Sequence, residues 1–541
     1  MVIQHDPEEA GSATEQLLRP GKQTNAIITW LRASCRSFRR KLRRRVLLRL
    51  LAFAVRFLLI PFAFLVAIVA IFAPSYSSPP SHYQLLERRC KTSSLALGCA
   101  NPHNEKVFIS AILYDKGGHL SGGFWGKRII ELINLLGPDN VFLSIYESGS
   151  GPAGRAALQD FSARVPCRKA IVSEDVASLE GLPNVTMPDG TTRTKRIAFL
   201  AELRNRALRP LDMVVGTEDV LKYDKVMFLN DVYFRSIDAA HLILNTNAGE
   251  SGRSRYLVAC ALDFANPFAV YDNYALRDAE GYAQYVNIFP FFSNKGQGKS
   301  RADIFAQTDA VRVKSCWGGM MVVQAKYVQN FNSALPSPDF QALKTQLVEP
   351  DYPRVVESPI RFRYEPEPYY DASESCLFPA DVATVAIRKG AEETGVYVNP
   401  YIRTAYHEIA LDILPTIRRI ERLLAPLFAV FTWFMPSDEQ PHRQVREGDT
   451  FTEEMWDGEG WKLKERRGRS GMFCGVREMQ TLRRSQRQHG RNWWDTKMPP
   501  GQKLDFRTMW GRILPETWRL DYTAASAEEK DNFFEFDRWH E

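Results

Sequence analysis

An asparagine–aspartate pair, Asn230 and Asp231, directly follows a short apolar run at residues 225–229. Such a run predicts a buried strand, so we expect the aspartate at the C-terminal end of that strand. In open α/β sheets, ligands bind at this edge. A carboxylate there could hold Mg²⁺ or Mn²⁺, which prefer oxygen ligands, and the cation would neutralise a departing nucleoside diphosphate. The alternative is an aspartate that caps a turn or the next helix.

The neighbouring sequence predicts an α/β scaffold for this site. Apolar runs at residues 107–113, 141–146 and 256–262 predict three further strands. Helical spacing of apolar residues predicts helices at residues 125–136 and 197–208. A strand, a helix and a strand in close succession form a βαβ unit, which favours a sheet with parallel strands.

The charge of the chain is concentrated near its beginning. The net charge of the 541 residues is +7, and residues 1–50 contain 11 Lys and Arg against 4 Asp and Glu. The remaining 59 basic and 59 acidic residues balance each other. This distribution gives no reason to expect a nucleic-acid partner.

The basic cluster at residues 39–45 precedes an apolar segment at residues 46–72, which is interrupted by Arg49 and Arg56. The segment is long enough to span a membrane once. The basic residues before it predict a cytosolic N-terminus and a lumenal remainder. We therefore expect a type II protein of the Golgi or another secretory-pathway membrane. A signal peptide and a buried core helix are the alternatives.

Seven of the eight cysteines follow this segment, and a lumenal compartment would allow them to form disulfides. Cys90 and Cys99 could close a short loop, whereas the other pairings cannot be predicted from sequence. We predict six regions along the chain: a cytosolic basic tail (1–45), a transmembrane anchor (46–72), a Pro/Ser-rich stem (73–104), a catalytic domain (105–410), an apolar helix (411–435) and a charged, loosely packed C-terminal extension (436–541).

Several sequence blocks occur together in the middle of the chain. In this combination the chain resembles the cryptococcal-type α-1,3-mannosyltransferase family of fungi, which includes capsule-associated proteins, over roughly residues 105–407. The blocks are residues 144–150, 201–208, 228–233, 268–272, 276–281, 315–320, 374–376 and 398–403.

The resemblance implies an α/β fold, a GT-A-like, Rossmann-related mixed sheet with flanking helices, preceded here by one N-terminal transmembrane helix. It also implies GDP-mannose as donor, Mn²⁺ or Mg²⁺ as cofactor, and transfer of mannose to a mannose-containing glycan acceptor in α-1,3 linkage with retention. Asp231 matches the second acid of the Asp-x-Asp motif and is the predicted metal ligand. Asn230 departs from that motif, so the other protein ligand stays unassigned. His407 is a candidate for it, or a surface histidine.

The resemblance places further residues at the donor. Each has a structural alternative: a turn residue for Glu147, a solvated helix face for Arg204, and a tight turn under a core tryptophan for Trp317 and Gly318. The predicted donor-binding residues are Glu147, Arg204, Asn205, Asn230, Trp317 and Gly318.

A second group of residues is predicted to hold the acceptor or to take part in catalysis, because sugar hydroxyls are bound by acids and sugar rings stack on aromatic faces. Structural ion pairing, for example between Arg277 and Asp278, or a disulfide-held loop at Glu374 are the alternatives. The candidates are Asp272, Arg277, Asp278 and Glu374, with Asp263 and Tyr271 nearby.

Two other functions remain open at this stage. A catalytically silent, membrane-anchored accessory protein of polysaccharide assembly or export would explain the missing first acid at Asn230. A glycoside hydrolase would need paired carboxylates about 5–10 Å apart. Asp272 and Asp278 could supply such a pair, but the predicted metal site would then have no role.

Overall fold

The chain divides into two compact units, Met1–Phe72 and Ala73–Glu541. The predicted cytosolic tail at residues 1–45 lies outside the described residues. The computed structural model describes residues 55–92, 97–175, 184–187, 190–212, 221–331, 356–391, 395–434, 442–482 and 493–496, and the single residues 46, 53 and 182.

The first unit contains an apolar helix made of a π-helical turn, η1 (Val55–Leu59), and α2 (Ile60–Phe72). Its 18 residues are all unburied, and in the described part of the chain no other helix is both long and apolar enough to cross a membrane. At 1.5 Å per residue the helix is about 27 Å long, close to the thickness of a hydrocarbon core. The predicted anchor is confirmed as a candidate span over these residues.

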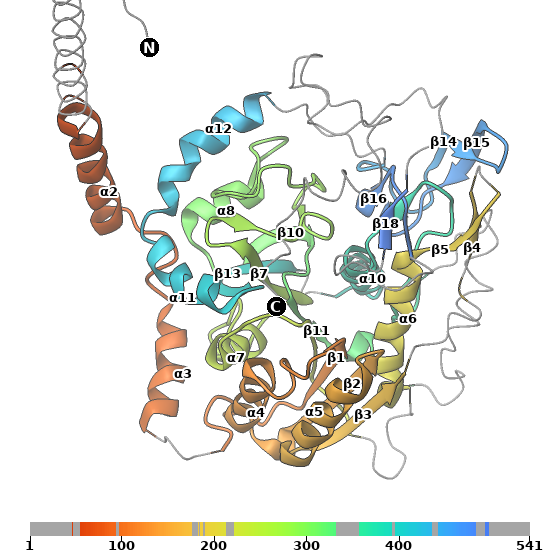
Figure 1. The fold of residues 1–541 in the computed structure, drawn as a ribbon, viewed down its shortest axis with the longest axis horizontal. Coiled ribbons are helices and arrows are strands. Elements are labelled where there is room, and N and C mark those ends of the chain that lie inside the picture. The colour runs from red at the N-terminus through yellow and green to blue at the C-terminus, as the bar shows by residue number, and fades with distance from the viewer. Residues whose placement is uncertain are drawn as a thin grey trace, which may run out of the picture. The chain divides into compact units, whose positions relative to one another are not determined.

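The second unit is built around a ten-stranded mixed sheet in the order β3-β2-β1-β6-β11-β7-β13-β10-β9, with β8 paired to β7 (Figure 1). Strands β3, β2, β1 and β6 are parallel, as are β7 and β13, whereas β11 runs antiparallel between β6 and β7. The sheet strands are β1 (Val107–Leu113), β2 (Val141–Ser148), β3 (Arg168–Glu174), β6 (Lys225–Leu229), β7 (Val258–Asn266), β8 (Ala269–Val270), β9 (Arg277–Asp278), β10 (Val311–Ser315), β11 (Met320–Gln324) and β13 (Val396–Ala405).

The four predicted strands are all present, and the predicted α/β class with a mixed sheet is confirmed. β1 and β6 have the predicted bounds, whereas the fourth strand begins at Val258 rather than at residue 256. Every residue of β6 is buried, which explains its uninterrupted apolar run.

The helices that flank the sheet follow from apolar faces at helical spacing. α6 and α10 contact one another, with α6 over β1 and β2, and α7 contacts α4 and strands β7, β11 and β13 (Figure 1). The helices of this unit are α3 (Ser81–Thr92), α4 (Phe124–Leu136), α5 (Gly151–Arg164), α6 (Arg196–Leu208), α7 (Ser236–Leu244), α8 (Lys299–Ala306), α10 (Glu374–Arg388), α11 (Glu408–Ile417) and α12 (Ala425–Phe434), with short 3₁₀ turns η2 (Pro138–Asn140), η3 (Arg209–Leu211), η4 (Ala325–Tyr327), η5 (Glu421–Leu424) and η6 (Met472–Cys474).

The predicted stem packs against the globular unit. Tyr76, Tyr83 and Leu86 are buried in the main core, and the Asn399 side chain donates a hydrogen bond to the Tyr83 hydroxyl at 2.5 Å. Within the predicted stem at residues 73–104, these three side chains therefore belong to the core of the second unit. Large aromatic side chains gain free energy by burial even when Pro and Ser dominate the segment around them.

A second prediction is wrong for residues 442–482, which we expected to be loosely packed. They form strands that join the rest of the unit, and β16 pairs with β12. Arg363 binds both carboxylate oxygens of Asp381, at 2.7 and 2.9 Å, and donates to the carbonyl of Ser470 at 2.7 Å. The remaining strands, all in two-stranded sheets, are β4 (Asn184–Thr186), β5 (Thr192–Thr194), β12 (Asp371–Ala372), β14 (Thr450–Trp456), β15 (Trp461–Arg467), β16 (Gly475–Val476), β17 (Gln480–Leu482) and β18 (Trp493–Asp495).

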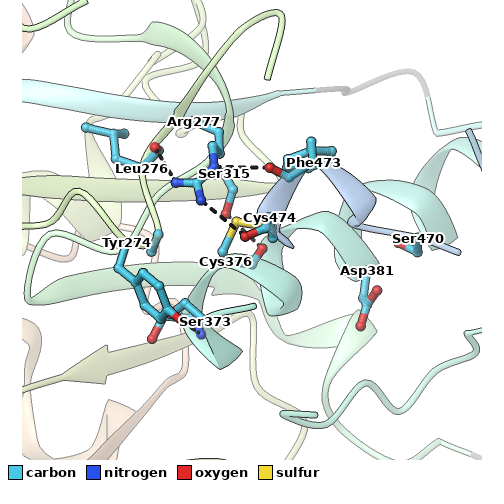
Figure 2. Close-up of a disulfide and its surroundings, with 12 residues drawn as sticks. Tyr274, Leu276, Arg277, Ser315, Ser373, Cys376, Asp381, Ser470, Phe473 and Cys474 are labelled. Carbon is cyan, nitrogen blue, oxygen red and sulfur yellow. Dashed lines mark hydrogen bonds between the residues drawn. A yellow bond between two sulfur atoms is a disulfide. The ribbon is translucent and has the colours of Figure 1, made fainter. Parts of the chain in front are cut away.

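Three disulfides lie in the described part of the chain: Cys90–Cys99, Cys260–Cys316 and Cys376–Cys474. The predicted short loop between Cys90 and Cys99 is confirmed, and Cys167 carries a free thiol. The Cys376–Cys474 bond ties the C-terminal segment to α10 (Figure 2).

The predicted apolar helix over residues 411–435 is two helices. α11 ends at Ile417, η5 follows, and α12 begins at Ala425. Pro426, which has no N–H to donate within a helix, lies in the first turn of α12 where that N–H is not needed. One continuous helix is therefore the wrong prediction for this segment.

Loop length predicts which disulfide contributes more to stability. Replacing Cys376 and Cys474 together by alanine should lower the melting temperature more than the same double replacement of Cys90 and Cys99. The first bond joins residues 98 apart and the second residues 9 apart, and the chain-entropy account assigns the longer loop about 2 kcal/mol more stabilisation. Thermal unfolding of the full chain in detergent, without reductant, measures the difference. Equal losses from the two double variants would contradict the prediction.

Candidate functional site

The tip of β6 is held from two sides, and this fixes the position of the predicted metal ligand. The indole N–H of Trp125 donates to the carbonyl of Asn230 at 2.8 Å. The backbone N–H of Asn230 donates to the carbonyl of Gly319, just before β11, at 2.9 Å. Asp231 comes next in the chain and is exposed to solvent. The strand thus presents a solvated carboxylate at the sheet edge where α/β proteins bind ligands.

The loop after Asp231 is joined to the end of β13. The N–H of Tyr233 donates to the carbonyl of Ala405 at 2.7 Å, and the N–H of Ala405 returns a bond at 3.0 Å. The residues that follow β6 and the end of β13 therefore meet at one edge, although Tyr233 and Ala405 are 172 positions apart in the sequence. His407 follows this junction and is the N-cap residue of α11.

Gly318 and Gly319 form the turn that leads into β11, and both have positive φ angles, of 59° and 70°. A Cβ atom at Gly318 would lie 1.9 Å from the carbonyl oxygen of Ala261, and one at Gly319 would lie 2.8 Å from the Val232 side chain. Gly318 was predicted to bind the donor, with a tight turn as the alternative, and in the structure its close backbone contact is with the chain itself. The turn brings β7, β11 and the residue after Asp231 into contact.

Arg204, on α6, lies beside the tip of β6. Its Nε donates to Glu374 at 3.0 Å, and its Nη1 donates to the side-chain oxygen of Asn230 at 3.3 Å. Its guanidinium carbon lies 4.1 Å from the centre of the Trp317 ring, within range of a cation–π interaction. The structure therefore brings three of the predicted donor residues, Arg204, Asn230 and Trp317, together with Glu374, which was predicted for the acceptor or for catalysis.

The electrostatics of Arg204 place Asp231 near this group as well. Burial lowers the pKa of Arg204 from its ordinary value, and the charges of Glu374 and Asp231 oppose that change. Burial disfavours a charged guanidinium, so nearby carboxylates are needed to keep it in the protein. The solvated carboxylate of Asp231 and the buried guanidinium of Arg204 thus act on one another at the same edge of the sheet.

The indole N–H of Trp317 is a buried donor without a hydrogen-bond partner among the described residues. The residue is only 4% exposed and lies under Arg204. A buried N–H that bonds to nothing is costly. An oxygen-rich ligand that reached this position would gain that hydrogen bond.

A second cluster of acids lies at the end of β7. The hydroxyl of Tyr406 donates to Asp263 at 3.1 Å, and the backbone N–H of Asp272 donates to the other oxygen of Asp263 at 3.2 Å. Asp272 in turn accepts from the N–H groups of Ala275 at 2.8 Å and Gly318 at 3.4 Å. The same turn at Gly318 therefore links this cluster to Trp317.

Burial and the charge of Asp272 raise the pKa of Asp263 to about 7. Burial also raises the pKa of Asp272, although three backbone N–H groups and Arg277 favour its charged form. Tyr271 is exposed, and its ring centre lies 4.5 Å from that of Tyr406. Asp263 itself is only 1% exposed, so the solvent-facing part of this cluster is formed by Tyr271, Asp272 and Tyr406.

Tyr406 was missed by the analysis of the sequence. It follows the last block of the resemblance by three positions, and its residue type is common in cores. No pattern in the sequence singles it out, because its contact with Asp263 depends on the pairing of β13 with β7.

Two of the predicted donor residues have their polar atoms engaged within the chain. Glu147 is fully buried at the end of β2 and accepts hydrogen bonds from the backbone of Ser150, at 2.6 Å, and from the hydroxyl of Ser173. The amide of Asn205 binds both backbone groups of Phe362, at 2.8 and 2.9 Å. Both side chains stabilise local structure, and their contact with a nucleotide stays a prediction.

Arg277 and Asp278, on β9, also bind neighbouring backbone. Arg277 is 1% exposed and donates to the carbonyls of Phe473, Cys474, Asn273 and Leu276 at 3.0 to 3.2 Å, next to the Cys376–Cys474 disulfide (Figure 2). Asp278 accepts from the N–H groups of Glu280 and Tyr282. These contacts hold the C-terminal segment and a turn, and a catalytic role for either residue is an untested prediction.

Asp231 fits one part of a divalent-cation site, since an exposed carboxylate can bind Mg²⁺ or Mn²⁺ while the cation keeps water and phosphate ligands. Among the described residues, no three His, Cys, Asp or Glu side chains are grouped closely enough to hold a metal by themselves. The protein contribution to such a site therefore centres on Asp231.

Comparison with known proteins identifies a family for this chain. Residues 106–381, half of the chain, match the family described as cryptococcal mannosyltransferase 1. A search of curated proteins finds no match. The matched residues contain β6, α6 and the start of α10, and so include Asp231, Arg204 and Glu374. The predicted resemblance to this family is confirmed, and the chain belongs to it.

Several solved structures show a distant likeness. A mannosyltransferase from Pyrobaculum calidifontis, in complex with GDP-Man and Mn²⁺, matches with a TM-score of 0.28 and 10% identity over 64% of this chain and 70% of its own. Mannosyl-3-phosphoglycerate synthase from Rubrobacter xylanophilus matches with a TM-score of 0.26 and 12% identity over 71% and 92% of the two chains. Glucosyl-3-phosphoglycerate synthase from M. tuberculosis matches with a TM-score of 0.25 and 12% identity over 68% and 92%. At these TM-scores the likenesses define neither the fold nor the activity of this chain.

The raised pKa of Asp263 predicts how stability depends on pH. The folded chain keeps a proton on Asp263 up to about pH 7, whereas the unfolded chain loses it near pH 4. The free energy of unfolding of the wild type should therefore fall as the pH rises between these values. Asp263→Asn removes this contribution, so the melting temperature of the variant relative to wild type should increase from pH 4.5 to pH 7.5.

Thermal unfolding of both proteins across this pH range tests the prediction. Asp160→Asn, an exposed aspartate on α5, serves as the control and should show no such trend. A difference between Asp263→Asn and wild type that stays constant with pH would contradict the assigned titration.

Proposed function

Because the chain belongs to the cryptococcal mannosyltransferase 1 family, we propose that it transfers mannose from GDP-mannose to a hydroxyl of a mannose-containing glycan. The proposed reaction forms an α-1,3 linkage with retention and depends on Mn²⁺ or Mg²⁺. The observation that supports it best is the exposed carboxylate of Asp231 at the tip of β6, beside the buried guanidinium of Arg204.

Asp231 is the proposed protein ligand of the cation. When bound, the cation would neutralise the negative charge that develops on the departing diphosphate. Two hydrogen bonds to the backbone of Asn230 fix the chain directly before Asp231 without help from the ligand. A site positioned in advance loses little conformational entropy when the donor binds.

Arg204 is proposed to bind the diphosphate next to Asp231. A guanidinium has five N–H donors in a planar arrangement that matches phosphate oxygens. Glu374 and Asn230 accept from two of its nitrogens and orient it, so Glu374 acts as a positioning residue. The buried N–H of Trp317 would supply a further donor at the same place.

The acceptor is proposed to bind near Asp263 and Asp272. The partly exposed carboxylate of Asp272 can accept hydrogen bonds from sugar hydroxyls, and the buried Asp263 lies behind it and accepts from its backbone N–H. The exposed ring of Tyr271 offers an aromatic face beside it. In a front-face reaction the acceptor oxygen would bond to the anomeric carbon as the bond to phosphate breaks, and the acceptor proton would pass to the departing phosphate oxygen.

The proposed topology is type II, with the second unit in the lumen of the Golgi or another secretory-pathway compartment. It is supported by the basic cluster before the candidate span. Three disulfides support it independently, since such bonds persist in an oxidising compartment.

Substitution of Asp231 tests the proposal directly. Asp231→Asn keeps the size of the side chain but removes its charge, so metal-dependent transfer from GDP-mannose should fall by about 100-fold, equivalent to about 2.7 kcal/mol. Initial rates with the full chain in detergent, at several Mn²⁺ concentrations, measure the effect. Asp160→Asn, an exposed aspartate on α5, should retain wild-type activity. Undiminished transfer by Asp231→Asn would remove this residue from the mechanism.

Calorimetry separates the proposed enzyme from a silent accessory protein. The full chain should bind GDP in the presence of Mn²⁺, and Asp231→Asn should weaken the Mn²⁺-dependent part of that binding. An accessory protein without a donor site would bind neither GDP nor Mn²⁺, and this result would overturn the proposal.

A further inference from the structure

α12 exposes an uncharged, apolar surface, which we call the outer face of α12. It consists of Leu427, Val430, Phe431, Trp433 and Phe434, whose exposed fractions are 50%, 51%, 48%, 80% and 61%. Large apolar side chains exposed side by side are unusual on a soluble surface and indicate a binding surface.

The outer face follows from helix geometry. Leu427, Val430, Phe431 and Phe434 recur at intervals of three and four residues, so they lie along one side of the helix. The other side faces the unit: Phe428 is 2% exposed, and the guanidinium of Arg301 lies 5.1 Å from the centre of its ring. α12 is thus attached through Phe428 and turns its remaining apolar residues outward.

The start of the second unit connects this helix to the membrane anchor. α2 ends at Phe72, and three residues later the N–H of Ser75 donates to the carbonyl of Arg418 at 2.8 Å. The side chain of Arg418 also donates to the carbonyl of Tyr76 at 3.3 Å. Three extended residues span about 10 Å, so this attachment point must stay close to the end of the anchor.

Arg418 directly follows α11 and precedes α12 by only the 3₁₀ turn η5 and a few residues. α11 contributes two more exposed apolar side chains, Ile409 and Ile413. The short linker after Phe72 limits how far Arg418 can lie from the end of α2, and α12 begins seven residues after Arg418.

We propose that the outer face of α12 inserts into the leaflet at which the anchor helix ends. Ten residues form a helix about 15 Å long, half the thickness of a hydrocarbon core, so α12 would lie in the interface and not span the bilayer. Trp433, the most exposed of the five, is the residue type that membrane interfaces favour. A second attachment would restrict rotation of the globular unit about the linker after Phe72.

Photo-crosslinking to lipid tests this proposal on the full chain. The protein is reconstituted into phosphatidylcholine vesicles that contain a phosphatidylcholine with a diazirine near the headgroup end of one acyl chain. Adducts are mapped by mass spectrometry after illumination. We expect adducts in Ala425–Phe434 as well as in Val55–Phe72, which is the internal positive control. Adducts in Val55–Phe72 without any in Ala425–Phe434 would overturn the proposal, as would crosslinks that join α12 to a second copy of the chain.

Variants show whether the outer face itself makes the contact. Phe431→Gln with Trp433→Gln should reduce lipid adducts on α12 by about half or more, because less apolar area enters the lipid, and should leave those on the anchor unchanged. Leu463→Gln, on β15, removes an exposed leucine of 69% exposure and is the matched control. Unchanged labelling of α12 in the double variant would contradict insertion through this face. The wild-type map decides the proposal even if a variant fails to fold.

Discussion

The close backbone approach at Gly318 and Gly319 is the constraint on which the candidate site depends. These two positions have no room for a Cβ atom, because Ala261 lies against one and Val232 against the other. The carbonyl of Gly319 accepts from the backbone N–H of Asn230, and the N–H of Gly318 donates to the carboxylate of Asp272. Trp317 directly precedes the turn. Residues from β6, β7 and β11 meet at one sheet edge because the chain can turn this tightly between them.

Buried ion pairs also stabilise the second unit. Arg204 pairs with Glu374, Arg363 pairs with Asp381, and Lys195 pairs with Asp371 at 2.6 Å. Removal of one partner from such a pair leaves an uncompensated buried charge, which is strongly destabilising. Arg363 also binds the carbonyl of Ser470, so the segment beyond the family match contributes to the same structure. A segment outside the family match therefore makes hydrogen bonds that stabilise the matched residues.

The sequence predicted those elements whose signal is local. An apolar run was enough for β1 and β6, and helical spacing was enough for α4 and α6. The packing of residues 442–482 could not be predicted, because it depends on single charges and one disulfide that contact residues about 100 positions earlier. Periodicity carries no information about such contacts.

The same distinction holds for the site. Arg204 and Asp231 were predicted from blocks whose order matches a family, and the structure brings them together. Arg277 was predicted from the same blocks, yet its guanidinium binds four backbone carbonyls around a disulfide. A block shared within a family marks a residue that matters, but it does not distinguish a ligand contact from a structural one.

Local charge explains why the proposed activity would require a cation. Arg204 carries one positive charge, while Glu374 and Asp231, which both act on it, carry one negative charge each. This group would repel a nucleoside diphosphate at close range. Asp231 would hold the proposed divalent cation, whose charge would make the net charge around Arg204 positive and so favour phosphate. The buried Asp263 titrates near pH 7, so it adds less negative charge than an ionised carboxylate would. In the proposed reaction, a cation on Asp231 would therefore favour binding of the donor at Arg204, and the proposed metal dependence would follow from this arrangement of charged side chains.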